Sequence, residues 1–160
     1  RINSIEEFRQ LIPGQFHLWS DSQILEANKI TVAKGADYEG LYIMLDKKRF
    51  DYFPRSILEL EKNLDEHKSL DITIDKYALI HYPTAYYFYV RKDDNVLAQD
   101  ILAGLEEAQQ DGSLETLFMS YYGKSITKIK NENRKIFNLE NPLLSPETPL
   151  YRKELWLSFE

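Results

Sequence analysis

Apolar residues in the first seventy positions fall into short β-rich runs, each followed by a stretch with apolar side chains at helical spacing. This alternation predicts three strand–helix units in series. Because a helix that connects two parallel strands packs back onto their sheet, the order predicts an α/β fold with a mainly parallel sheet. The expected strands are 15–19, 29–35 and 50–53, and the expected helices begin at 20–22 and cover 37–49 and 57–68.

A short helix is expected ahead of these units, over residues 4–12. Ser4 and Glu7 have the spacing of a capping box, in which the two side chains bind backbone N–H groups at the start of a helix. Pro13 and Gly14 then end the helix.

The pattern changes at residue 71. The β-rich run 71–90 is interrupted by Pro83, where we expect a change of direction, because proline cannot donate a hydrogen bond within a central strand. Two helices are predicted next, the first ending near Asp111-Gly112 and the second near Gly123. The tail, 126–160, contains prolines and little periodicity, which predicts an extended arm on the surface.

Composition narrows the classes of function. The chain has 160 residues, 43% hydrophobic and 29% charged, which is typical of a globular protein with one core. A formal net charge of -6 argues against a nucleic-acid-binding surface. The absence of cysteine excludes disulfides, thiolate catalysis and cysteine-ligated metal sites. No apolar run is long enough to cross a bilayer, and residues 1–10 show no secretory pattern in a chain that opens with Arg rather than Met.

Candidate ligand-binding residues follow the ends of the predicted strands. In open α/β sheets, ligands bind outside the carboxyl ends of the parallel strands. After the first strand, Ser20, Asp21 and Ser22 begin a helix whose free backbone N–H groups favour an anion such as a carboxylate. The alternative is that Ser20 or Asp21 only caps the helix.

The next two strand ends carry charged candidates. Asp37 or Glu39 could reach a cationic group of a ligand, or could simply favour the start of a helix through its dipole. Arg55, followed by Ser56, leaves a corner fixed by Pro54. Arginine suits a carboxylate ligand, and the alternative is a structural ion pair with Asp51 or Glu59.

The aromatic run from Tyr82 to Tyr89 could line a ligand. As a strand it would place Tyr86 and Phe88 on one face and Tyr87 and Tyr89 on the other, so that half or more of the rings pack in a core. We take Tyr86 as its candidate ligand contact.

Signatures of catalysis are not found in the sequence. The three histidines lack metal-ligand spacing, and no nucleophile elbow, glycine-rich phosphate loop or Walker sequence occurs. His17 is interpreted as a core or edge residue of a strand, and His67 as a residue at the C-terminal end of a helix. We therefore expect no enzyme, no cofactor and no metal.

With this order of elements the chain resembles the type II periplasmic binding proteins, specifically the family 3 solute-binding components of polar amino acid ABC transporters. The most specific match is Arg49-Phe50-Asp51, where the family has glycine or arginine, a variable residue and aspartate leading towards its site. Asp111-Gly112 matches a dipeptide between the family's last two helices. The other matching segments are SIEEFRQL, GQFHLWSDS, YEGLYIMLDKKR and AYYFYVRKD.

The resemblance implies a fold and a division of the chain. Residues 1–83 would form the second lobe of a solute-binding protein, a three-layer α/β/α lobe with a mainly parallel sheet. Residues 84–160 would supply a crossover strand, two helices and an extended tail that pack on a first lobe, whose N-terminal part lies outside this sequence. Where amino acid binders commonly have an aspartate for the ligand ammonium, this chain has Ser56, with Arg55 just before it. Glu39 or Asp21 could replace that aspartate, the ligand could carry a second acidic group, or the chain could be a member of the family that has drifted away from amino acids. The pairing of Arg55 with Ser56 favours an anionic group over a simple ammonium.

The resemblance also implies a function. The protein would be the periplasmic or extracytoplasmic receptor of an amino acid-type ABC transporter, would close two lobes on a small polar solute by a hinge motion, and would deliver it to a membrane permease. A ligand-sensing domain of a membrane signalling receptor is the first alternative, and a dehydratase-like enzyme on the same fold is the second. A chain without its first lobe would expose the apolar faces of its C-terminal helices and form a homodimer or swap elements.

Overall fold

The computed structural model describes residues 2–159. The chain forms two compact units. Unit 1 contains the residues up to Ala85 together with those from Ile129 onward, and unit 2 is Tyr86–Lys128. Each unit is described by itself.

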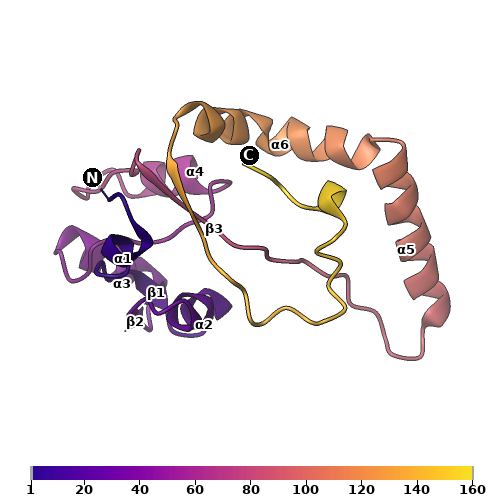
Figure 1. Cartoon of the computed structure of the whole chain (residues 1–160), viewed down its shortest axis with the longest axis horizontal. Coiled ribbons are helices and arrows are strands. Elements are labelled where there is room, and N and C mark those ends of the chain that lie inside the picture. Colours follow the sequence, from indigo (N-terminus) through magenta and orange to yellow (C-terminus); the bar gives the residue numbers. More distant parts are fainter. Residues whose placement is uncertain (1, 160) are drawn as a thin grey trace. The chain divides into compact units, whose positions relative to one another are not determined.

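Unit 1 is a mixture of short strands and helices (Figure 1). In chain order its elements are α1 (Ile5–Phe8), β1 (Gly14–Phe16), α2 (Ser20–Ala27), β2 (Ala33–Gly35), α3 (Tyr38–Asp46), α4 (Leu60–Glu66), β3 (Ala78–His81), β4 (Lys135–Asn138) and the 3-10 helix η1 (Lys153–Leu155). The mixed α/β character predicted from the sequence is confirmed.

The strands pair in parallel. β1 lies beside β2 with Gly14 opposite Ala33, and a single parallel bridge joins Pro13 to Tyr52 on its other side. Gly14 N donates to Tyr52 O over 2.9 Å, and Asp51 N donates to Ile12 O over 2.8 Å. Three parallel segments therefore run side by side with β1 in the middle. β3 and β4 form a second parallel pair, so hydrogen bonding divides the strands between two sheets.

The helices and strands of the first seventy residues are shorter than the sequence predicts, because turns form early. The strand expected over 15–19 ends at Phe16, where Trp19 N bonds back to Phe16 O at 3.0 Å and leads into α2. The helix expected from residue 57 begins at Leu60, after a turn closed by Glu59 N and Ser56 O at 3.0 Å. The capping box is confirmed in part, since Glu7 N donates to Ser4 Oγ at 3.1 Å while Glu7 Oε2 accepts from Asn3 N.

The first part of the tail was wrongly predicted to be an extended surface arm, whereas residues 139–152 form no helix or strand. The tail first completes α6 (Ser113–Asn131), which passes through Gly123 instead of ending there. The left-handed residue after this helix is Asn133, with φ 46°. The next part is β4, which pairs with β3 over four residues and buries Phe137. A strand that finds its partner more than fifty residues earlier leaves no local signal beyond a few alternating apolar residues.

The expected aromatic strand is not formed either. β3 ends at His81, and residues 82–90 form no strand. Tyr86, Tyr87, Phe88 and Tyr89 are all exposed, at 96%, 54%, 71% and 90%. No alternation between a buried and a solvent face exists here, because no neighbouring strand supplies a surface to pack on.

Unit 2 holds α5 (Asn95–Gln110) and most of α6, which Figure 1 shows as successive helices joined by a short turn. α5 ends at Gln110 with Asp111 as its C-cap, close to the predicted end, and Gly112 follows with φ 77°. None of the side chains in 86–125 is buried. Within residues 2–159, no helix is long and apolar enough to cross a membrane.

The core of unit 1 is formed jointly by the first thirty residues and by the β4 region. Its buried cluster is Phe8, Leu25, Ile30, Phe137 and Leu139. The ring of Phe8 stacks on that of Phe137, with 4.5 Å between the ring centroids. α1, α2 and β4 are thereby held together around one apolar centre.

Tyr52 brings a polar atom into this core. Its hydroxyl is buried and finds no hydrogen-bond partner among residues 2–159, and burial raises the pKa of this phenol well above its usual value. We expect Tyr52→Phe to raise the free energy of unfolding by about 1 kcal/mol, because an unsatisfied buried hydroxyl is removed. Urea denaturation followed by tryptophan fluorescence measures the change.

Tyr42→Phe is the matched control. The buried Tyr42 hydroxyl lies 3.0 Å from that of Tyr38, so its removal breaks a hydrogen bond and should lower the free energy of unfolding by about 1 kcal/mol. Equal losses in both variants would show that the Tyr52 hydroxyl is hydrogen-bonded in solution.

Candidate functional site

The carboxyl ends of the three parallel segments in unit 1 each lead to an aromatic residue. Trp19 follows β1, Tyr38 follows β2, and Phe53 follows the bridge residue Tyr52. The rings of Trp19 and Phe53 are nearly parallel, with 6.3 Å between their centroids. The ring of Tyr38 is tilted relative to that of Trp19, with 5.9 Å between the two centroids. We call Trp19, Tyr38 and Phe53 the aromatic cage.

The guanidinium group of Arg55 lies in this cage. Its Cζ atom is 4.9 Å from the ring centroid of Trp19, 5.2 Å from that of Tyr38 and 5.5 Å from that of Phe53. All three distances are within the range of cation–π attraction. The Arg55 side chain is only 16% exposed. A fixed positive charge therefore stands at the strand edge where ligands of α/β sheets bind.

Two polar groups of α4 and its N-cap complete the surroundings of Arg55. Arg55 Nε donates to Asn63 Oδ1 at 3.2 Å, and Nη2 contacts Glu59 Oε2 at 2.5 Å. Of the two acidic partners left open by the sequence, Glu59 is the one that pairs with Arg55. Asp51 instead accepts a hydrogen bond from Ile12 N at 2.7 Å.

A second layer of polar contacts fixes α4 against α3. The side-chain amide of Asn63 lies 3.4 Å from the Tyr38 hydroxyl. His67 Nδ1 lies 2.7 Å from Asn63 O, and its ring stacks on Tyr42 at 3.6 Å between centroids. Burial and the hydrogen bond with Tyr38 raise the pKa of Tyr42, so this phenol stays neutral.

The contact between His67 and Glu39 joins the end of α4 to the start of α3. His67 Nε2 lies 2.9 Å from Glu39 Oε2. The imidazole is 9% exposed and the Glu39 side chain 68% exposed, so the carboxylate stands on the solvent side of the contact.

The predicted residues at 20–22 lie at the start of α2. Trp19 is the N-cap and makes no side-chain capping bond, so the alternative that Ser20 or Asp21 caps this helix is wrong. Ser22 is buried and its hydroxyl donates to Phe16 O at 3.1 Å. Asp21 accepts a hydrogen bond from the Tyr82 hydroxyl. Of these three residues, only Ser20 is exposed.

The other predicted residues are found in different settings. Glu39 and Arg55 both belong to the network around α4. Ser56 is exposed, and its Oγ accepts from Leu58 N at 3.3 Å. Asp37 caps α3 through Gly40 N at 2.7 Å. Tyr86 belongs to unit 2 and is therefore not placed relative to this site.

Sequence reasoning missed the aromatic cage and two polar residues of α4. Trp19, Tyr38 and Phe53 could have been found from one signal, since each lies within three residues of a strand end. Asn63 and His67 gave no such signal, because their role depends on how α4 packs. His67 is the C-cap of α4, as the sequence indicated.

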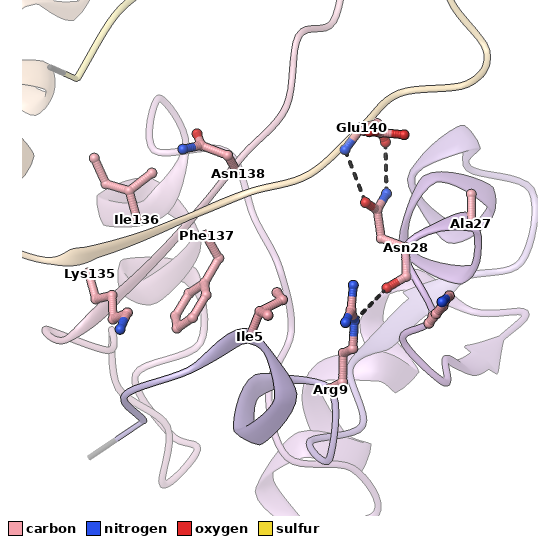
Figure 2. A pocket seen from close by; sticks show the side chains of 10 residues that line it. Ile5, Arg9, Ala27, Asn28, Lys135, Ile136, Phe137, Asn138 and Glu140 are labelled. Atoms are coloured by element: carbon pink, nitrogen blue, oxygen red, sulfur yellow. Dashed lines mark hydrogen bonds between the residues drawn. The ribbon is translucent and has the colours of Figure 1, made fainter.

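A pocket of about 570 Å³ lies elsewhere in unit 1, between α1, the end of α2 and β4 (Figure 2). Two of the three cations that line it are engaged by the backbone: Arg9 Nε donates to Asn28 O at 3.0 Å, and Lys135 donates to Asn3 O. The Asn28 side chain bonds both backbone groups of Glu140, as Figure 2 shows. These contacts give Arg9, Asn28 and Lys135 a structural role.

Residues 2–159 contain no cluster of three or more histidine, aspartate or glutamate side chains that could hold a metal ion. Searches against protein-family models, curated proteins and solved structures find no match to the chain. The candidate site of unit 1 is the aromatic cage together with Arg55.

Proposed function

We propose that the chain forms part of an extracytoplasmic solute-binding protein of an amino acid-type ABC transporter, and that it binds a small polar solute at the Arg55 edge of unit 1. The observation that carries this proposal is the position of Arg55. Its charge is held by three rings at the carboxyl ends of three parallel segments. Positive charge at that edge suits a carboxylate-bearing solute.

The resemblance of the sequence to family 3 solute-binding proteins supports the proposal. The Arg49-Phe50-Asp51 match leads directly into the bridge at Tyr52 and then to Arg55. In that family the site lies between two lobes, so unit 1 would present one half of it. Exposed Ser20 and Ser56, with Glu39 beside α4, would line this half, while Asp21 and Ser22 would fix the start of α2.

Binding would then be coupled to closure. A solute held at Arg55 and contacted by a second lobe stabilises the closed arrangement, because it makes its full set of contacts only there. The closed form would be the one that a membrane permease recognises.

A thermal-shift screen of the full-length protein tests the proposal, using amino acids, dicarboxylic acids and small peptides. A solute present at about one hundred times its Kd stabilises a protein by about 2.7 kcal/mol, which should raise Tm by about 5–10 °C. We expect Arg55→Ala to lose most of this shift, measured against its own ligand-free Tm.

Arg91→Ala serves as the control, because Arg91 is 79% exposed and lies in unit 2. It should keep the full shift. If the solute stabilised Arg55→Ala as strongly as the unmodified protein, Arg55 would not be a ligand contact. If no solute of any class raised Tm, the proposed function would be wrong.

A further inference from the structure

The two residues of the Arg55–Glu59 ion pair differ in burial and in the number of groups that hold them. Arg55 is 16% exposed and is held by the aromatic cage and by Asn63. The Glu59 side chain is 51% exposed, and the residue is the N-cap of α4 without a side-chain capping bond. The contact with Arg55 is the one hydrogen bond of the Glu59 side chain among the described residues. The cation is therefore fixed, whereas its carboxylate partner is free to leave.

The pair also uses only part of what arginine offers. One oxygen of Glu59 contacts one terminal nitrogen of Arg55, whereas an arginine and a carboxylate can form two parallel hydrogen bonds. A carboxylate approaching from the solvent side can replace the single contact without leaving Arg55 unpaired. The other acidic groups nearby are engaged, since Glu39 contacts His67 and Asp37 caps α3.

We propose that Glu59 occupies the place of a carboxylate of the solute, and that the Arg55–Glu59 pair is a latch which the solute opens by exchanging one carboxylate for another. This inference rests on the proposed function and narrows it to solutes that carry a carboxylate. A solute whose polar groups are neutral leaves the latch closed. One that carries only an ammonium group meets the fixed charge of Arg55 and is repelled.

The latch has a measurable consequence for affinity. When the competing carboxylate pairs with Arg55 for nine-tenths of the time, the apparent affinity of the solute falls about tenfold. Glu59→Gln removes the competing charge and keeps the shape of the side chain. The variant should therefore bind a carboxylate solute about tenfold more tightly than the unmodified protein.

The test uses small carboxylates, each compared with its own amide: acetate with acetamide, succinate with succinamide and benzoate with benzamide. Binding to the full-length protein is measured by titration calorimetry for the unmodified protein, Glu59→Gln and Glu66→Gln. Glu66 is the matched control, because it pairs with Lys62 on the exposed side of the same helix, α4, at 3.7 Å.

We expect at least one carboxylate to bind, its amide to bind at least tenfold more weakly, and only Glu59→Gln to tighten binding of the carboxylate. Unchanged or weaker binding to Glu59→Gln would overturn the latch while leaving the proposed function standing, because Glu59 would then be a bystander or a ligand contact. Equal binding of a carboxylate and its amide would overturn the assignment of solute class. If neither these probes nor the amino acids and peptides of the thermal-shift screen bound to any of the three proteins, the proposed function and the latch would both fall.

Discussion

Replacing Phe137 by alanine should lower the free energy of unfolding of unit 1 by about 3–5 kcal/mol. Phe137 is 4% exposed, and its ring stacks on that of Phe8 with an interplanar angle of 14°. Leu25, Ile30 and Leu139 belong to the same buried cluster. Truncation leaves a cavity among side chains from α1, α2 and β4, which cannot all move inward to fill it.

Urea denaturation followed by tryptophan fluorescence is suited to this measurement, because the two tryptophans of the chain, Trp19 and Trp156, both belong to unit 1. Phe88→Ala is the control, since Phe88 is 71% exposed and lies in unit 2, and it should change stability by less than about 0.5 kcal/mol. If Phe137→Ala were as mild as this control, the tail would not be part of the core.

Phe137 and its strand β4 also show which part of the fold the sequence could not predict. Strand–helix alternation over the first seventy residues is a local signal, and it gave the mixed α/β class and the parallel pairing of β1 with β2. β4 is four residues long and pairs with β3 across the whole of α5 and α6. β4 is held in place by the packing of Phe137 with Phe8 and Leu25, residues that are distant in the sequence. A local sequence pattern does not predict such contacts.

The candidate site was predictable to a similar extent. Arg55 was found because a charged residue directly after a strand end is placed by the sheet. Its surroundings were not found, because the cage is assembled from three separate strand ends and Asn63 reaches Arg55 from α4. The choice between Asp51 and Glu59 as the partner of Arg55 likewise depends on where α4 begins, which is Leu60 and not residue 57 as predicted.

Helix ends in the second half show the same division between local and non-local causes. Asp111 and Gly112 were correctly predicted to end α5, because a glycine with φ 77° needs no tertiary contact to stop a helix. Gly123 was wrongly predicted to end α6. Its backbone stays helical, and the residues after it continue the helix to Asn131, where Ile129 is buried.

Gly14→Ala is the second change with a large expected effect, a loss of about 3 kcal/mol in the free energy of unfolding. A Cβ atom at this position would lie 2.1 Å from Cζ of Phe50 and within 2.5 Å of two further ring atoms. The backbone cannot move away, since Gly14 N is bonded to Tyr52 O at 2.9 Å and β1 pairs with β2. The ring cannot turn aside easily, because Phe50 is 5% exposed.

Gly104→Ala is the matched control. Gly104 lies inside α5, and no atom lies within 4 Å of an added Cβ, so alanine should strengthen this helix by about 0.5–1 kcal/mol. Helix content measured by circular dichroism reports on this variant, and tryptophan fluorescence reports on Gly14→Ala. If Gly14→Ala caused no more loss of stability than Gly104→Ala, the Phe50 ring would not lie over Gly14 of β1.

The strain that alanine introduces at position 14 should also displace residues of the candidate site. Phe50 is followed by Tyr52, Phe53 and Arg55, so an alanine that displaces its ring displaces the segment that carries the cation and one wall of the cage. We therefore expect Gly14→Ala to weaken solute binding under conditions where the variant is still folded. The double variant Gly14→Ala, Phe50→Leu gives the new methyl group space, and its loss of stability should be clearly smaller than the sum of the two single losses. Additive losses would place the cause of the instability somewhere other than the contact with Phe50.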